Sequence, residues 1–270
     1  MVYVVKSADT SEGRRFSDRV DSLLRDTNPQ RVAFDCEGVR LSRVGSLELV
    51  SICFPDMEVY LLDFGSHPCP DIVRSTKELF ENDEVTKIIH DCRVDCDALF
   101  HLHGIKLVNV HDTSCFHDVI AHTEHKSLNA VLMHNGIRPN TKRDNAVYKH
   151  DPRFWSRRPL SKRMLDWASS DVDKLFALAD AQLLAAPTAS KRAVASAKST
   201  RYTRTVRDMN VVTDLRVRNP GLFVGSGGQN IRNLTARTGT QVYQDEAKGT
   251  WIVFYPSTAS LNAVKRQMEL

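Results

Sequence analysis

Long apolar runs are missing from this sequence of 270 residues. Stretches such as Val59–Leu62 are far shorter than the roughly 18 consecutive apolar residues that a membrane-spanning helix needs. The N-terminus, Met-Val-Tyr-Val-Val-Lys, lacks the basic, apolar and small-residue order of a secretory signal. We therefore predict an intracellular protein, cytoplasmic or nuclear with an organelle as the alternative, that has no membrane partner.

Cysteine is scarce as well, and its pattern excludes several classes of site. The six cysteines all lie in the first half of the chain, and none forms a CxxC pair. Neither a P-loop lysine motif nor a GxGxxG dinucleotide motif is present. A zinc cluster could be considered for four residues, but their spacing fits no common zinc pattern: Cys92, Cys96, His101 and His103. Buried, reduced thiols are the simpler interpretation.

Charge is distributed unevenly along the chain. Residues 187–270 contain 13 Lys and Arg against 5 Asp and Glu, a net charge of +8, whereas residues 1–186 carry −4. The stretch 187–207 holds six bases, no acids and many small residues. We interpret residues 187–208 as a basic linker between a first domain, 1–186, and a second, 209–270. A basic second domain favours a polyanionic partner.

Apolar periodicity in residues 1–186 predicts alternating strands and helices. The expected strands are Arg31–Asp35, Leu47–Phe54, Glu58–Asp63, Thr86–His90 and Lys106–Val110. One helix is expected over Asp95–His103, and a long one after Ser161 with an apolar face from Met164 to Ala179. Further helical stripes surround Phe16, Leu79, Phe116 and Val131. This order predicts an α/β fold in which helices flank a mixed sheet.

A pair of acids closes the first predicted strand. Asp35 and Glu37 are one residue apart, so on an extended chain their side chains point to the same side. Two facing carboxylates repel each other unless a cation lies between them. Oxygen-only ligands favour Mg²⁺ or Mn²⁺.

Two further acid-bearing segments make the pattern specific. FDCEG, at the end of the first strand, is followed by IIHDCRVDCDALF and then by RFWSRRPLS with MLDWASSDV. Over residues 30–183 this order resembles the DEDD superfamily of 3′–5′ exonucleases, within it the branch of ribonuclease D and its animal relative Egalitarian. The resemblance implies a ribonuclease H-like fold, which agrees with the predicted strands and helices.

The same resemblance implies the site residues. The four family acids fall on Asp35, Glu37, Asp95 and Asp171. Family chemistry is a two-metal hydrolysis, in which Asp35 would bridge both ions. Glu37 and Asp171 would hold the ion that activates water, and Asp95 would support the second ion through water. Asp91 and Asp97 are alternatives to Asp95.

One position departs from the family pattern. The branch has a tyrosine four residues before the last acid, where this chain has Trp167. An indole N–H can donate a hydrogen bond but cannot accept one, so it cannot act as a base. The protein is therefore either a 3′–5′ exonuclease or a weak or inactive RNA-binding adaptor that keeps the exonuclease fold.

Bases and aromatics are interleaved just before the predicted long helix. Such mixtures can bind single-stranded nucleic acid by pairing with phosphates and stacking on bases. Alternatively, the aromatics belong to the core and the bases are solvated. The residues are Arg153, Phe154, Trp155, Arg157, Arg158, Lys162 and Arg163, of which we select Arg157 and Arg158 as RNA contacts.

A glycine-rich turn marks the second domain. The segment Gly225-Ser226-Gly227-Gly228, with the helix and two strands expected after it, resembles the GxxG loop of a type I KH domain. Small residues let the backbone approach phosphates, and a helix N-terminus favours anions. A KH domain clamps single-stranded RNA in this way, so this loop and Arg232 on the next helix are predicted RNA contacts, with DNA as an alternative ligand. The sequence does not indicate a protein partner.

Overall fold

The structure is a computed structural model, and it describes residues 1–123, 127–144 and 146–269. The chain divides into two compact units. The first comprises Met1–Asn145 and Arg153–Arg207, and the second comprises Ala146–Pro152 and Asp208–Leu270. Each unit has its own sheet and is considered separately. Within the described residues, no helix combines the length and apolar character that crossing a membrane would require.

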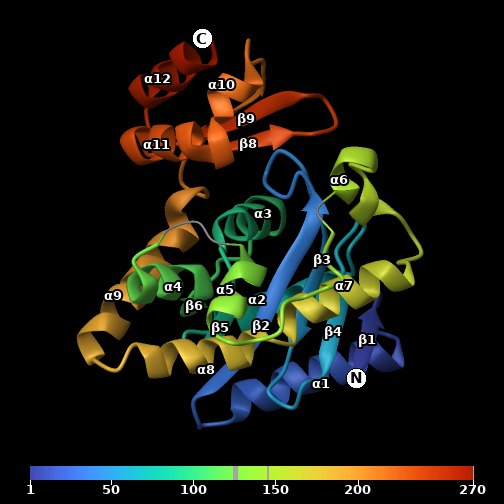
Figure 1. The fold of residues 1–270 in the computed structure, drawn as a ribbon. Helices are drawn as coiled ribbons and strands as arrows, with labels where there is room; N and C mark the ends of the chain where they lie inside the picture. The colour runs from blue at the N-terminus through green and yellow to red at the C-terminus, as the bar shows by residue number, and fades with distance from the viewer. Residues whose placement is uncertain (124–126, 145, 270) are drawn as a thin grey trace. The chain divides into compact units, whose positions relative to one another are not determined.

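The first unit is built on a six-stranded sheet of order β1-β4-β3-β2-β5-β6 (Figure 1). Neighbours β2/β3 and β3/β4 are antiparallel, and the other pairs are parallel, which confirms the expected mixed sheet. The strands are β1 (Val2–Val5), β2 (Gln30–Val39), β3 (Ser46–Cys53), β4 (Val59–Asp63), β5 (Val85–Ile89) and β6 (Val110–Asp112).

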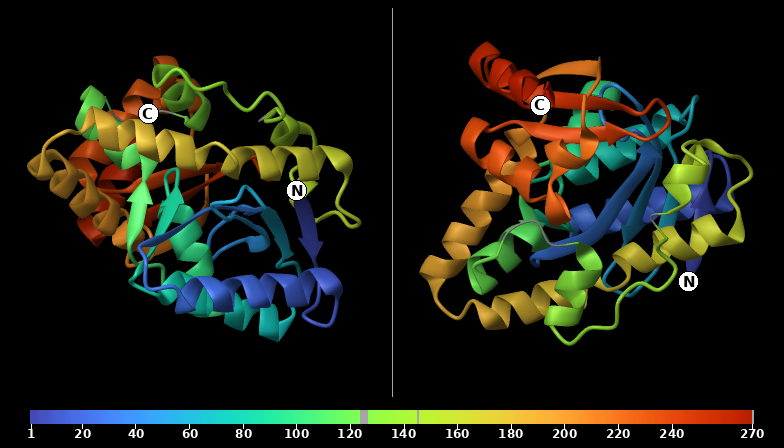
Figure 2. Two further views of the ribbon diagram at one scale, coloured as in Figure 1. Left: turned by 90° about the horizontal axis from the view of Figure 1, so that it is seen from below. Right: turned by 45° about the horizontal axis from the view of Figure 1, so that its top comes forward.

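Helices cover both faces of this sheet. On one face lie α1 (Ser11–Arg25) and α2 (Pro70–Glu81), and on the other α7 (Lys162–Val172) and α8 (Leu175–Ala185) (Figure 2). Phe34 and Cys36 of β2 share a hydrophobic core with Phe16 of α1 and Phe80 of α2. Because side chains alternate along a strand, Asp35 and Glu37 project from the opposite face, toward α7. The first unit's remaining elements before residue 160 are α3 (Arg93–His103), α4 (Thr113–Ala121), α5 (Leu128–His134) and the 3₁₀ turn Phe154–Ser156.

Several predicted boundaries were wrong. The strand carrying the acid pair continues to Val39, because its second half pairs with β3, so Asp35 and Glu37 lie within the strand and not at its end. The strand expected over Lys106–Val110 is shorter and begins only at Val110. The long helix after Ser161 is interrupted at residues 173–174, although apolar residues continue through both of its parts. Strand β1 was not predicted, and it pairs in parallel with β4.

The largest correction concerns residues 187–208, whose composition predicted a linker. They form α9 (Ala189–Thr205), which belongs to the first unit. Thr188 caps the helix by accepting a hydrogen bond from the backbone N–H of Lys191. The buried face consists of Ala195, Ser199 and Thr203, spaced one helical turn apart. Since these residues are small and partly polar, hydropathy does not reveal that they form a packing surface.

The second unit is a three-stranded antiparallel sheet with helices. Its sheet order is β7-β9-β8, and a T-shaped contact of Phe223 and Trp251, with ring centroids 5.1 Å apart, lies in its core. Its elements are α6 (Val147–His150), β7 (Asn210–Leu215), α10 (Pro220–Val224), the 3₁₀ turn Ser226–Gly228, α11 (Gln229–Thr238), β8 (Gln241–Asp245), β9 (Thr250–Tyr255) and α12 (Thr258–Met268).

Candidate active site

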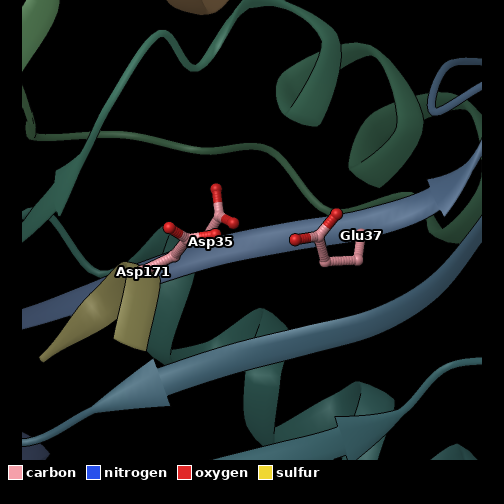
Figure 3. Close-up of side chains that lie close together, drawn as sticks. All are labelled: Asp35, Glu37 and Asp171. Carbon is pink, nitrogen blue, oxygen red and sulfur yellow. The ribbon is translucent and has the colours of Figure 1, made fainter. Parts of the chain in front are cut away.

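Three of the predicted acids converge beneath α7. One carboxylate oxygen from each of Asp35, Glu37 and Asp171 lies within 4.8 Å of the others (Figure 3). Two come from β2 and the third from α7, far later in the chain. Glu37 and Asp171 are buried and Asp35 is partly exposed. The structure therefore brings together the residues that the DxE spacing and the later acid motif had predicted.

Burial and mutual repulsion dominate the electrostatics of this site. Burial, followed by the negative charge of Asp171, raises the pKa of Asp35 to about 7. Burial and the charge of Asp35 raise the pKa of Glu37 well above its ordinary value. In addition, Glu37 Oε1 is buried and accepts no hydrogen bond from the described residues. Converging oxygens with an unused buried acceptor are the donor set that a hard divalent cation prefers, so these residues fit Mg²⁺ or Mn²⁺.

Asp95 is not one of the three converging acids, but it is near enough for the charge of Asp35 to act on it, whereas its two rivals are paired with arginines. Asp95 is 4% exposed, and its pKa is raised well above its ordinary value by burial and then by the negative charge of Asp35. The Asp97 carboxylate accepts hydrogen bonds from the backbone N–H of Arg43, at 2.6 Å, and from Arg43 Nε, at 2.8 Å. Asp91 accepts from the guanidinium of Arg93 at 2.6 and 2.7 Å. These pairings favour Asp95 as the fourth acid.

The two residues just before α3, the helix that carries Asp95, are held by a residue that was not predicted as part of the site. Fully buried Asp112 accepts hydrogen bonds from the backbone N–H of Asp91, at 3.0 Å, and of Cys92, at 2.8 Å. The same carboxylate caps α4 by accepting from the N–H groups of Ser114 and Cys115. Asp112 therefore fixes the start of α3. An Asp directly before a helical stripe is an N-cap signal in the sequence, but its second set of partners is visible only in three dimensions.

Trp167 is located one helical turn before Asp171 and is completely buried. Its ring centroid lies 5.4 Å from that of Trp155 and 5.8 Å from that of Phe154. Phe154 and Trp155 are themselves buried, so the core alternative holds for these two aromatics and they are not stacking platforms for RNA. Trp167, which stands where the resemblance leads us to expect a tyrosine, is thus packed in an aromatic cluster of three side chains.

Two further neighbours of Asp171 were also missed. Asn140 Nδ2 donates to Asp171 Oδ1 at 2.9 Å, and Arg143 Nη1 donates to Asp171 Oδ2 at 3.1 Å. Asn140 also donates to the backbone carbonyl of Trp167, at 3.3 Å. Both residues lie in the loop after α5, where no helical or strand period identifies them. Together they hold the Asp171 carboxylate in one orientation.

The two bases selected as RNA contacts differ in their environments. The Arg158 guanidinium donates to both carboxylate oxygens of Asp63, at 2.9 and 2.6 Å, and to the Glu48 carbonyl, at 2.9 Å. The Arg158 side chain, 27% exposed, is thus engaged in intramolecular pairs, and its contact with RNA stays a prediction. Arg157 is exposed, and its contact with RNA stays a prediction.

The glycine loop lies at the surface of the second unit, between α10 and α11. Gly225, Gly227 and Gly228 have positive φ angles of 73°, 55° and 80°, a region that L-residues other than glycine seldom adopt. A Cβ at Gly225 would come within 2.6 Å of the Asn230 side chain, which explains the glycine there. Arg232 Nη1 donates to the Gly227 carbonyl at 2.5 Å, which places this base beside the loop.

Comparisons with known proteins find similarity in the part of the chain that forms the first unit. Residues 17–183 match the family described as 3′–5′ exonuclease. Ribonuclease D of Nitrobacter hamburgensis is 33% identical over 110 residues, which are 39% of this chain and 27% of that protein. The piRNA biogenesis protein EXD1 of Bombyx mori is 28% identical over 100 residues, 37% of this chain and 30% of that protein. The chain thus matches less than a third of the length of either relative.

The fold of this chain is also similar to that of a solved structure. Trypanosoma brucei RNase D in complex with RNA U12 superposes with a TM-score of 0.59 and 24% identity, covering 76% of this chain and 71% of that one. The family match ends at residue 183, so it does not bear on the KH assignment for residues 209–270. The family match includes all four candidate acids, Trp167, and the polar neighbours of Asp171. By the extent of this match, the chain belongs to the 3′–5′ exonuclease family.

Proposed function

We propose that this protein hydrolyses single-stranded RNA from its 3′ end with Mg²⁺ or Mn²⁺ as cofactor. The observation that carries the proposal is the convergence of Asp35, Glu37 and Asp171 oxygens within 4.8 Å of one another. A divalent pair in such a site supplies a nucleophilic hydroxide and neutralises the charge that develops on a transferring phosphoryl group. Family membership supports the exonuclease reaction, and the RNA-bound neighbour supports RNA as the substrate.

In this proposal the chain contributes ligands and the groups that orient them. Asp35, Glu37 and Asp171 would hold metal directly. Asn140 orients Asp171 through the 2.9 Å hydrogen bond. Asp95 would act on the second ion, and Asp112 positions it by fixing the start of α3. Trp167 is not assigned the role of catalytic base, because the indole cannot accept a proton.

We further propose that the second unit is a KH domain that holds the RNA. Its order of strand, helix, glycine turn, helix, two strands and helix supports a type I KH domain, as does the antiparallel sheet order β7-β9-β8. The open space around Gly227 leaves room for a phosphate, and Arg232 supplies a positive charge beside the loop. Of the net charge of +8 over residues 187–270, +6 lies in residues 187–207 of the first unit and +2 in residues 208–270, so the whole basic stretch, and not this unit alone, would increase affinity for a polyanion.

One observation favours a second candidate, an RNA-binding adaptor with little or no nuclease activity. Trp167 packs against Phe154 and Trp155 with no exposed surface, so the position of the family tyrosine has become part of the core. A missing acid or base group typically lowers an enzymatic rate by about 10²–10⁴-fold. The adaptor would retain RNA binding through the second unit while its acids still bind metal.

A time course on 5′-labelled single-stranded RNA separates the two candidates. The exonuclease should produce a ladder that shortens from the 3′ end with Mg²⁺ or Mn²⁺ and stops when EDTA is added. A DNA oligonucleotide of the same sequence tests the preference for RNA. If RNA is bound but remains full-length under single-turnover conditions with excess protein, the adaptor is correct and the exonuclease proposal fails.

A further inference from the structure

The acid site contains a cation of its own. Arg143 Nη1 lies 3.1 Å from Asp171 Oδ2, and the Arg143 side chain is 32% exposed whereas that of Asp171 is fully buried. The positive charge of Arg143 also opposes the rise in pKa at both Asp35 and Glu37. Arg143 therefore acts electrostatically on all three converging acids and not only on its hydrogen-bond partner.

Two other arginines of the first unit pair with acids outside the converging group. Arg43 is paired with Asp97, at 2.5 Å, and also donates to the carbonyls of Val206 and Arg207. Arg93 is paired with Asp91, at 2.6 Å, and lies over the ring of Tyr202. The guanidiniums of Arg43 and Arg93 therefore neutralise acids outside the site. The charge of Arg143 instead acts on the converging acids.

The loop holds Asn140 and Arg143 by different contacts, and Arg143 also lies over the ring of Trp167, 6.0 Å from its centroid. Asn140 is fixed to Asn129 of α5 by two hydrogen bonds, of 2.8 and 3.0 Å. The loop then turns, because the backbone N–H of Lys142 donates to Asn140 Oδ1 at 2.8 Å. Asn140 thus anchors the loop and orients Asp171, whereas Arg143 lies three residues further along with a partly exposed side chain.

We propose that Arg143 is a built-in counterion that competes with a divalent cation for the Asp171 carboxylate. Metal binding then requires the guanidinium to be displaced, so Arg143 weakens the affinity of the site for metal and stabilises the metal-free protein. This inference rests on the proposed function, since it assumes that the converging acids bind metal. It assigns a role in cofactor affinity to a residue that no sequence motif identified.

Calorimetric titration of the full chain with Mn²⁺ alone tests this role. Arg143→Met removes the charge and keeps an unbranched side chain, and we expect it to bind Mn²⁺ about tenfold or more tightly than the parent, given the strength of charge interactions at this distance in a partly buried site. Lys142→Met is the matched control, because it removes one charge from the same loop at an exposed position. It should change the affinity much less. Arg143→Lys keeps the charge and should stay close to the parent.

Thermal unfolding gives an independent readout. In EDTA, Arg143→Met should unfold at a lower temperature than the parent, yet Mn²⁺ should raise its unfolding temperature by more. A merely structural arginine would lower the stability without tightening metal binding. Should Arg143→Met fail to fold, Arg143→Gln serves in the same two measurements.

The outcomes are distinguishable. If the parent binds Mn²⁺ and Asp35→Asn with Glu37→Gln does not, the metal site is real. In that case, the proposal that Arg143 competes with metal is wrong if Arg143→Met binds Mn²⁺ as tightly as the parent or more weakly. If neither the parent nor Arg143→Met binds Mn²⁺ or Mg²⁺, the metal site itself is wrong, and the proposed function fails together with this inference.

Discussion

The backbone N–H of Asp112 donates a hydrogen bond to the hydroxyl oxygen of Ser199, 3.1 Å away. This bond joins α9 to the residue that fixes the start of α3 and thereby the position of Asp95. The segment that follows α9 makes a second connection, since the carbonyls of Val206 and Arg207 accept from Arg43, the partner of Asp97. Helix α9 is therefore a structural part of the exonuclease unit.

The place of truncation should consequently decide whether this unit folds. A chain ending at Arg207 should unfold cooperatively, whereas one ending at residue 186 should be strongly destabilised or insoluble. Leaving a buried donor such as the Asp112 N–H unsatisfied costs about 1–3 kcal/mol, and the buried face of α9 is removed in addition. Circular dichroism melts of the two chains provide the measurement. Ser199→Ala in the full chain isolates the single bond, and melts of equal midpoint for both truncations would refute the role of α9.

The stability of the metal-free protein should fall as the pH rises. The pKa of Asp35 in the folded protein is raised from 3.8 to about 7, so between these values the folded state binds more protons than the unfolded state. Stability then decreases with pH across this window, and Glu37 and Asp95 add in the same direction because their pKa values are raised too. The nearby positive charge of Arg143 only reduces the effect.

Melts in EDTA between pH 5 and 8 measure this dependence. We expect the midpoint of the parent to drop more steeply than that of Asp35→Asn, and saturating Mg²⁺ to reduce the difference. A parent and an Asp35→Asn variant with the same slope would show that the buried acids do not repel one another as the structure indicates.

Restoring the family residue at position 167 should increase the cleavage rate. Trp167→Tyr supplies a hydroxyl one helical turn before Asp171, and the ceiling for such a group is about 10²–10⁴-fold. Because Trp167 packs against Trp155 and Phe154, the smaller ring should also cost about 0.5–3 kcal/mol of stability. Single-turnover cleavage of RNA with excess protein gives the rate. Trp167→Phe is the control for ring size, and equal rates for Tyr and Phe would mean that the hydroxyl has no role.

Negative charge in the glycine loop should weaken RNA binding. Gly227 has open space around it and a φ of 55°, a conformation that Asp and Asn tolerate better than most residues. Ser226→Asp with Gly227→Asp should therefore fold and still repel phosphates, while the Asn pair controls for size.

Filter binding over a range of salt concentrations measures this effect. The logarithm of the affinity for a single strand falls with the logarithm of the salt concentration, with a slope of about −0.7 for each phosphate that the protein neutralises. The Asp pair should therefore bind more weakly and with a shallower slope than the parent. Unchanged affinity and slope in the Asp pair would exclude this loop as the RNA-binding surface.

Local pattern was sufficient to predict much of the first unit and the shared side of Asp35 and Glu37. Asp171 was named only by the resemblance to the DEDD exonucleases, and the structure brings the three acids together. The chain order of strands also predicted a mixed sheet, although it missed β1, whose pairing with β4 depends on a distant segment.

The missed features share a physical cause. Asn140, Arg143 and Asp112 matter because of partners far away in the sequence, and the loop that holds Asn140 and Arg143 shows no period. Helix α9 was missed because Ala195, Ser199 and Thr203 form its buried face without large apolar side chains. Phe154 and Trp155 beside several arginines resembled a nucleic-acid surface, but burial of both rings shows that they support Trp167.

The most direct measurement of the central claim compares the parent with Asp35→Asn and Glu37→Gln combined, on 5′-labelled single-stranded RNA with Mg²⁺ or Mn²⁺. The account predicts a metal-dependent ladder from the parent and none from the variant. It also predicts that the variant folds, binds RNA like the parent and is more stable in EDTA at pH 8, because the repulsion between buried carboxylates is gone. Undiminished cleavage by the folded variant would contradict the account, since the reaction would then take place outside the acids that converge beneath α7.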